Sequence, residues 1–421
     1  MERNRVELSN GMDHRYSTSK GFMHYMSSLQ PRNICVFLYN LRKISRMMEV
    51  SSNGRFYINR LPIDGLESQD VATEVLEALK AIRSELVDFV THIDTTGSGI
   101  GVYTGALGIL YVLDLYDSTQ RWKERLRGMR DSIHLERPTL LSSDLLLFVQ
   151  TGDYDNLRLF VQRARSLPHN ECEVMNGRAG CLSGLLLARR FHPELKVDGW
   201  ITQLVDDIVQ EGTREATGRF TWSWHSKEYL GAIHGIAGIL FVLLRCNISD
   251  SECVTLQRTV DYILSDLSLP SGNVPSSVGN GSDKLVHFCH GATGWIPLVC
   301  LMISRFPAKA AWYKERASVL GAVVWQRGIL ATKGPGICHG ISGSICGLVD
   351  LYRSGCGDIW LRRAEALGLF LSKEWPRFKP LADRPFSLYE GVGGAYYALS
   401  MLVMERSRPV NIAFETSFPC Y

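Results

Sequence analysis

Two short motifs in this sequence combine residues that bind metals. The tripeptide Cys-His-Gly begins at Cys289 and again at Cys338, 49 positions later, and an apolar stretch follows each copy. Thiolate and imidazole are ligands that Zn²⁺ prefers, and two cysteines with one histidine leave a fourth tetrahedral position for a substrate or water. We therefore predict a zinc site at Cys289, Cys338 and His339. His287 and His290 are expected to support it, because such a site needs only three protein ligands.

The elements that must position these ligands are repeats. The pattern Gly-x-x-Gly recurs at intervals of 49 to 72 residues, beginning at Gly105, Gly177, Gly235, Gly291, Gly340 and Gly391. Such a period holds two helices and two loops, and the longest interval leaves room for an eroded copy near residues 141–147. The chain therefore contains seven units, of which the second is degenerate.

Each repeat combines two kinds of helix. A wholly apolar run follows each glycine pair, such as ILFVLL at residues 239–244, whereas the segments between them are amphipathic, with Trp360, Ala364 and Leu367 at helical spacing in one case. We expect an all-α fold, an (α/α) toroid of seven helical hairpins with the glycine turns at one end of the inner ring. An open α-solenoid is the competing architecture, but its repeats seldom gather metal ligands from separate copies.

Composition limits the cellular setting and the partners. The net charge is +3 with acids and bases interspersed, so no nucleic-acid footprint is expected. The apolar run at residues 34–39 is far shorter than the roughly 20 residues of a membrane span, so any membrane association should be peripheral. Scattered cysteines without a secretory signal favour a cytoplasmic location. Residues 1–47 carry eight Lys or Arg against three acids, and we expect a disordered basic extension before a domain at 48–421.

Four longer motifs resemble those of LanC-like proteins, the eukaryotic relatives of bacterial lanthionine synthetase cyclases. They are EYLGAIHGIAG at 228–238, LVHFCHGATG at 285–294, KGPGICHGISG at 333–343 and PFSLYEG at 385–391. The similarity runs over residues 55–405, and it implies the same toroid and the same zinc ligands. It also implies addition of a thiol to dehydroalanine or dehydrobutyrine: in bacterial relatives this closes thioether rings, whereas eukaryotic members add glutathione to proteins or peptides that contain dehydroamino acids.

The resemblance assigns catalytic roles to two residues. A free thiol is only a few per cent ionised at pH 7, and zinc ligation ionises it fully. Addition of the thiolate creates an enolate, which needs a general acid to protonate its α carbon. His234, at the mouth of another glycine turn, matches the family's catalytic histidine. Glu173 stands where LanC-like proteins carry glutamate, and it could orient His234 or assist proton transfer.

Glutathione carries two carboxylates, and the resemblance implies basic residues that bind them. Lys333 matches the family's glutathione-binding lysine, and Arg55 matches an N-terminal arginine with the same role. For a third basic contact the sequence offers Arg377, Lys379 and Arg384, none of which aligns cleanly, and we take Arg384.

Two other functions compete with this reading. The first is a sensor or adaptor that binds zinc and glutathione without turnover. The second is a carbohydrate-active toroid in which Glu173 and Glu390 act as acid and base, although cysteine and histidine at the same rim argue against it. The aromatic residues Trp222, Trp224 and Tyr229 either belong to the core or line a peptide groove near His234.

Overall fold

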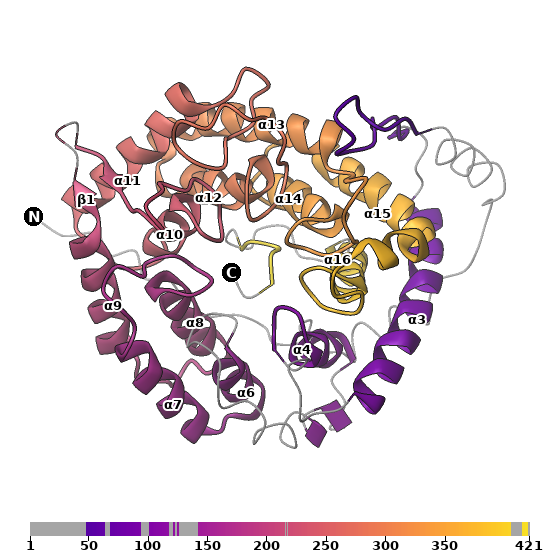
Figure 1. The fold of residues 1–421 in the computed structure, drawn as a ribbon, viewed down its shortest axis with the longest axis horizontal. Helices are drawn as coiled ribbons and strands as arrows, with labels where there is room; N and C mark the ends of the chain where they lie inside the picture. The colour runs from indigo at the N-terminus through magenta and orange to yellow at the C-terminus, as the bar shows by residue number, and fades with distance from the viewer. Residues whose placement is uncertain are drawn as a thin grey trace, which may run out of the picture.

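The structure, a computed structural model, describes residues 48–63, 68–93, 101–117, 121–122, 124–125, 142–214, 216, 218–405 and 415–419. Its helices form two concentric rings (Figure 1). The inner ring contains α4 (Ala106–Asp117), α6 (Ser143–Thr151), α8 (Arg178–Phe191), α10 (Ile236–Leu243), α12 (Ala292–Arg305), α14 (Ile341–Arg353) and α16 (Val392–Glu405). The outer ring contains α3 (Ser68–His92), α7 (Tyr154–Arg165), α9 (Asp198–Glu211), α11 (Asp250–Tyr262), α13 (Ala310–Arg327) and α15 (Ile359–Phe378). The predicted toroid of helical hairpins is confirmed, while the extension expected at 1–47 lies outside the described residues.

Short elements join the helices. Strands β1 (Thr213–Arg214) and β2 (Phe220–Thr221) follow α9 and precede α10 in the chain, and they pair antiparallel with Thr213 opposite Thr221. A π-helical turn, η3 (Ile263–Leu267), extends α11, and two 3₁₀ turns are η4 (Pro307–Lys309) and η5 (Lys379–Leu381).

Helices from the two ends of the toroid close the ring. The inner helices pack in sequence order, and α4 contacts both α6 and α16. Helix α3 lies on the outside of this junction, where it packs against α15 and α16 (Figure 1). Because the first described helix meets the last two, the repeats form a closed ring and not an open solenoid.

Burial follows the two expected patterns. Every residue of α10 is buried, as expected for an inner helix covered on all sides. The outer helix α7 buries Leu157, Phe160 and Ala164 along one face, at the spacing of an amphipathic helix. Across the described ranges, no helix combines the length and the apolar character that a bilayer crossing requires.

The second repeat has lost its glycine turn but keeps its inner helix. The side chain of Ser142 caps α6 by accepting a hydrogen bond from the backbone N–H of Leu145, and Gly152 ends the helix in the left-handed conformation. A serine cap therefore replaces the paired glycines, in agreement with the degenerate repeat predicted from the sequence.

A segment that follows α16 lies inside the ring. Residues 415–419, drawn in yellow at the centre of Figure 1, are anchored on α14. The Asp350 carboxylate accepts hydrogen bonds from the Ser417 backbone N–H at 2.5 Å and from the Thr416 hydroxyl at 2.6 Å. The Tyr397 hydroxyl donates to the carbonyl oxygen of Ser417 at 2.7 Å. This segment, which we call the inner segment, fills the centre of the core.

Candidate active site

The three predicted metal ligands lie together at one rim of the inner ring. The donor atoms of Cys289, Cys338 and His339 are all within 4.8 Å of one another, and both cysteines are buried. Cys289 stands in the loop before α12, and the other two residues stand in the loop before α14. Adjacent repeats therefore contribute to one cluster, as the spacing of the motifs predicted.

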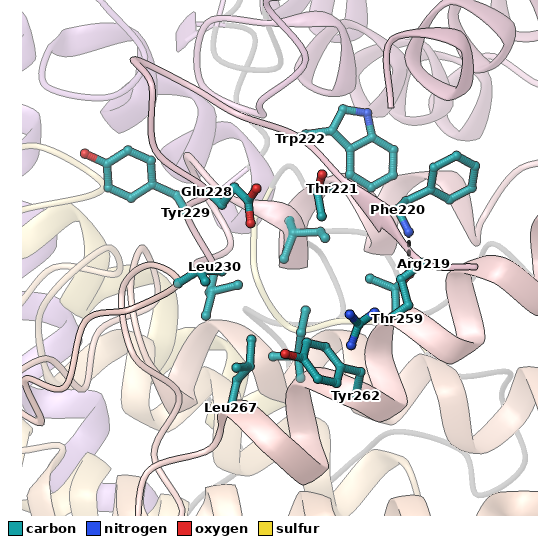
Figure 2. Close-up of a pocket in the computed structure, with 13 residues that line it drawn as sticks. Arg219, Phe220, Thr221, Trp222, Glu228, Tyr229, Leu230, Thr259, Tyr262 and Leu267 are labelled. Atoms are coloured by element: carbon teal, nitrogen blue, oxygen red, sulfur yellow. Dashed lines mark hydrogen bonds between the residues drawn. The ribbon is translucent and has the colours of Figure 1, made fainter. Parts of the chain in front are cut away.

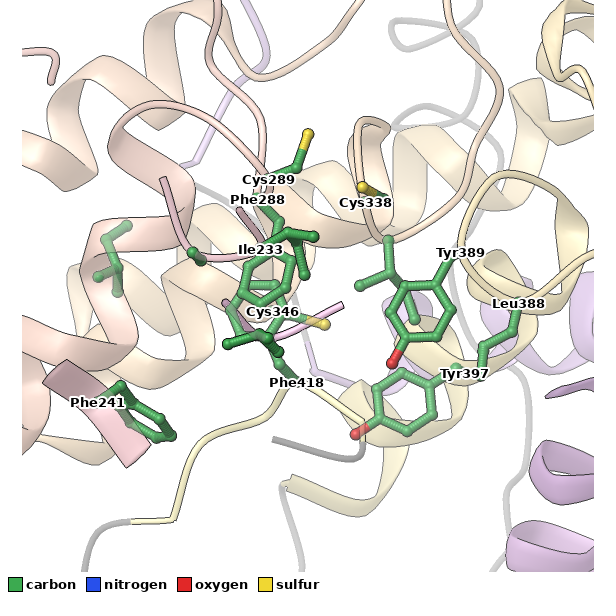
Figure 3. Close-up of a cluster of buried hydrophobic side chains, with 14 of the residues drawn as sticks. Ile233, Phe241, Phe288, Cys289, Cys338, Cys346, Leu388, Tyr389, Tyr397 and Phe418 are labelled. Atoms are coloured by element: carbon green, nitrogen blue, oxygen red, sulfur yellow. The ribbon is translucent and has the colours of Figure 1, made fainter. Parts of the chain in front are cut away.

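Backbone hydrogen bonds interlock the loops that carry these ligands. The carbonyl oxygen of Cys338 accepts bonds from the backbone N–H groups of Phe288 at 2.9 Å and Cys289 at 3.3 Å. The backbone N–H of Cys338 donates to the carbonyl oxygen of Tyr389 at 2.8 Å. Three successive loops are thus tied at Cys338, and Figure 3 shows both cysteines above the apolar cluster that supports them.

Asn273 fixes the Cys289 loop through hydrogen bonds to the residues on either side of it. No sequence motif marked Asn273. Its side-chain N–H₂ donates to the carbonyl oxygen of Leu285 at 2.8 Å, and its side-chain oxygen accepts from the backbone N–H of Ala292 at 2.8 Å. Gly291 lies between them with φ +104°, and a Cβ there would stand 2.2 Å from the carbonyl oxygen of Leu285. Only glycine fits this turn, because both the backbone angle and the contact exclude a side chain.

Burial and mutual interactions shift the pKa values of Cys289, Cys338 and His339. Interaction with the Cys289 thiol holds the pKa of the Cys338 thiol well below its usual range, and His339 and Tyr103 lower it further against the effect of burial. The same interaction with Cys338, together with burial, raises the pKa of the Cys289 thiol. Burial lowers the pKa of His339, but the hydrogen bond and charge of Cys338 outweigh it and raise the net value. Burial and mutual interaction thus shift the pKa values of the two thiols in opposite directions.

His234 and Glu173 form a second polar pair. The Nδ1 atom of His234 donates to Oε2 of Glu173 at 2.7 Å, and Glu173 is almost fully buried. Backbone N–H groups of Met175, at 3.1 Å, and Asn176 also donate to this carboxylate. The Trp224 ring stacks on His234 with centroids 4.5 Å apart and planes within 5°. Hydrogen bonding and stacking together fix the orientation of the imidazole.

His290 lies between this pair and the metal ligands. Its ring centroid is 6.3 Å from that of His234, and it directly follows Cys289 in the chain. Gly231 permits the approach of the two loops, since a Cβ there would stand 1.9 Å from the carbonyl oxygen of Cys289. Burial and the charge of His234 lower the pKa of His290. The two polar groups therefore face one region of the rim.

Two of the predicted basic residues, Lys333 and Arg55, lie at the same rim. The carbonyl oxygen of Arg55 accepts a hydrogen bond from the backbone N–H of Ala331 at 3.0 Å, which places Arg55 beside the loop of Lys333. Burial lowers the pKa of His287 to about 3, and the charges of His339, His290, Lys333 and Arg55 add to this effect.

The structure distinguishes the three alternatives for the third basic contact. Arg377 hydrogen-bonds to the hydroxyl of Tyr57, and the Lys379 ammonium lies 2.6 Å from the carboxylate of Glu85. Arg384 is exposed, and among the described residues its guanidinium has no ion-pair partner. Arg384 is therefore the cation of the three that is open to a ligand.

The aromatic residues divide between core and site. Trp222 is buried and donates its indole N–H to the carbonyl oxygen of Ile208, whereas Trp224 covers His234. Tyr229 lies 5.9 Å from the His290 ring and also lines a cavity of about 60 Å³ (Figure 2). This cavity is lined by β2, by α11 with η3, and by residues 228–230 of the loop that carries His234.

Comparisons with known proteins place the chain among relatives. The family model described as "Lanthionine synthetase C-like protein" matches residues 64–412. The zebrafish (Danio rerio) "Glutathione S-transferase LANCL1" is 31% identical over 260 residues, covering 59% of this chain and 61% of the relative. The Arabidopsis thaliana "LanC-like protein GCL1" is 30% identical over 231 residues, covering 53% of each.

A solved structure shares the fold. "Nisin cyclase" superposes with a TM-score of 0.60 at 15% identity, covering 78% of this chain and 94% of its own. The aligned part spans about half to three fifths of the curated relatives, but the family model covers most of the chain. This chain therefore belongs to the lanthionine synthetase C-like family.

Proposed function

We propose that this protein is a zinc-dependent enzyme that adds the thiol of glutathione to dehydroalanine or dehydrobutyrine residues of proteins or peptides. The observation that carries the proposal is the meeting, at one rim, of a Cys289, Cys338 and His339 cluster with the Glu173–His234 pair. The name of the zebrafish relative supports glutathione as the thiol.

The cluster fits zinc in donor type and in spacing. Two thiols and an imidazole within 4.8 Å of one another match the ligand types and the close packing of a tetrahedral site with one open position. When bound there, zinc would ionise a substrate thiol and hold its sulfur at the rim. Asn273 and the hydrogen bonds at Cys338 keep the ligand loops in place before any ion arrives.

The remaining steps belong to side chains of this protein. Lys333, Arg55 and Arg384 bind the carboxylates of glutathione. The thiolate sulfur forms a bond to the β carbon of the dehydro residue, and the electron pair of the double bond moves onto the α carbon and its carbonyl. His234 delivers a proton to the α carbon, while Glu173 holds Nδ1 so that Nε2 is the donating nitrogen. The thiol proton replaces the one that His234 gave, so the net reaction is simple addition.

A carbohydrate-active function is less consistent with this geometry. Glu173 is buried against His234 and two backbone N–H groups, so its carboxylate is not open to a glycosidic oxygen. The sensor or adaptor function uses the same binding groups, and it differs only in lacking turnover.

The test is the intact mass of a dehydrobutyrine peptide after incubation with the full chain, zinc and glutathione. We expect a gain of one glutathione, and we expect His234→Asn to slow it roughly 10²- to 10⁴-fold while zinc and glutathione still bind. His92→Asn, on the exposed end of α3, is the matched control and should retain the wild-type rate. Zinc and glutathione binding without any mass gain would favour the sensor; an unimpaired His234→Asn would remove its acid role.

A further inference from the structure

The loop before α16 carries a carboxylate that the reaction above does not use. The carbonyl oxygen of Glu390 accepts a hydrogen bond from the backbone N–H of Gly336 at 3.0 Å, one step along from the bond between Cys338 and Tyr389. This short backbone ladder aligns Glu390 with the loop that runs from Lys333 to the metal ligands. Figure 3 shows Tyr389, which precedes Glu390 in the chain, below and to the right of Cys338.

The carboxylate of Glu390 has few partners of its own. Its Oε2 atom is shielded from solvent, and no described residue donates a hydrogen bond to it. Burial raises the pKa of this carboxyl and the charge of Asp383 adds to that effect, whereas the charges of His339 and Arg384 oppose it. A shielded carboxylate oxygen without a donor is costly, and a ligand that supplies a charged donor removes that cost.

The proposed thiol substrate carries such a donor. Glutathione has two carboxylates and one ammonium besides its thiol. Lys333, Arg55 and Arg384 are complementary to the carboxylates, but like charges repel, so these cations oppose the ammonium. An ammonium has three N–H donors and no acceptor, and a carboxylate is the side chain that matches it.

We propose, resting on the function proposed above, that Glu390 binds the ammonium group of glutathione and so selects thiols with a free amine. Its place on the ladder with Gly336 puts it at the same rim as the cations that bind the carboxylates. Glu390 is thereby a specificity-determining residue, and it takes no part in proton transfer.

The experiment is calorimetric titration of the zinc-loaded full chain with glutathione and with glutathione acetylated on its amine. The wild type should prefer the free amine by roughly tenfold to a hundredfold, the range expected for a charged hydrogen bond. Glu390→Gln keeps the shape and removes the charge, so the preference should vanish while affinity for the acetylated form stays constant. Asp383→Asn is the matched control: it removes a neighbouring exposed charge and should keep the preference.

Each alternative outcome is distinct. Retention of the preference in Glu390→Gln, or its absence in the wild type, overturns the inference. Equal weakening of both ligands together with loss of zinc means that Glu390 supports the structure of the site, which also overturns it. If the wild type shows the preference but leaves the dehydrobutyrine peptide unchanged in mass, the proposed turnover fails and this inference stands. No binding of glutathione overturns both.

Discussion

At the scale of single residues, Cys338 joins the most parts of the site. Its backbone ties the Cys289 loop to the Tyr389 loop, and Cys289, His339 and Tyr103 all act on its thiol to lower its pKa. The cluster of Cys289, Cys338 and His339 could be predicted from the sequence because the Cys-His-Gly motif is duplicated. Tyr103 could not, since a single tyrosine in a distant repeat reaches the cluster only through closure of the ring.

Cys338→Ala should release zinc with little loss of fold. Removal of a residue that only hydrogen-bonds to a metal ligand lowers metal affinity roughly 10- to 100-fold, and we expect loss of Cys338 itself to lower it more. Zinc content by elemental analysis after dialysis measures it. Cys346→Ala removes another buried thiol, from α14 itself, and should keep stoichiometric zinc. A Cys338→Ala protein that retains full zinc would contradict the ligand assignment.

At the scale of elements, the glycine turns made much of the fold predictable. Gly235 and Gly340 stand directly before α10 and α14, where the paired-glycine pattern placed the start of an apolar helix. The inner segment had no such signal. Its few residues show neither helical period nor repeat, and their position depends on contacts with α14 that only the folded ring creates.

The inner segment should stabilise the metal site. Phe418 stacks on Phe288, the neighbour of Cys289, with ring centroids 4.1 Å apart. We expect Phe418→Ala to speed the loss of zinc to a chelator, because removing a buried aromatic ring costs about 3–5 kcal/mol and frees the Cys289 loop.

The rate should be measured well below the unfolding temperature, so that it reports the site and not global unfolding. Phe418→Leu should restore much of the wild-type rate. Phe191→Ala, which removes an exposed ring at the end of α8, should leave it unchanged. Equal zinc loss in all three variants would argue against a link between the inner segment and the site.

At the scale of the whole molecule, the described contacts that close the ring join α3 and α4 to the last helices, and α3 begins at Ser68. Deleting residues 1–47 should therefore leave the melting temperature and glutathione addition unchanged. Deleting residues 1–57 removes Arg55 and the buried Tyr57, and it should weaken glutathione binding. Thermal denaturation and calorimetry compare the two truncations. A collapse in stability of the shorter deletion would show that the extension is part of the fold.

Closure of the ring also determines when the molecule can form. Helix α3 packs against α15 and α16, so its partners are made only when most of the chain has been synthesised. Until then the surface of α3 that packs on α15 and α16 stays exposed, although α4 can already pack against α3. Contacts between such distant parts of a chain form slowly. During translation this protein should therefore depend on chaperones that shield α3 until α15 and α16 have been synthesised.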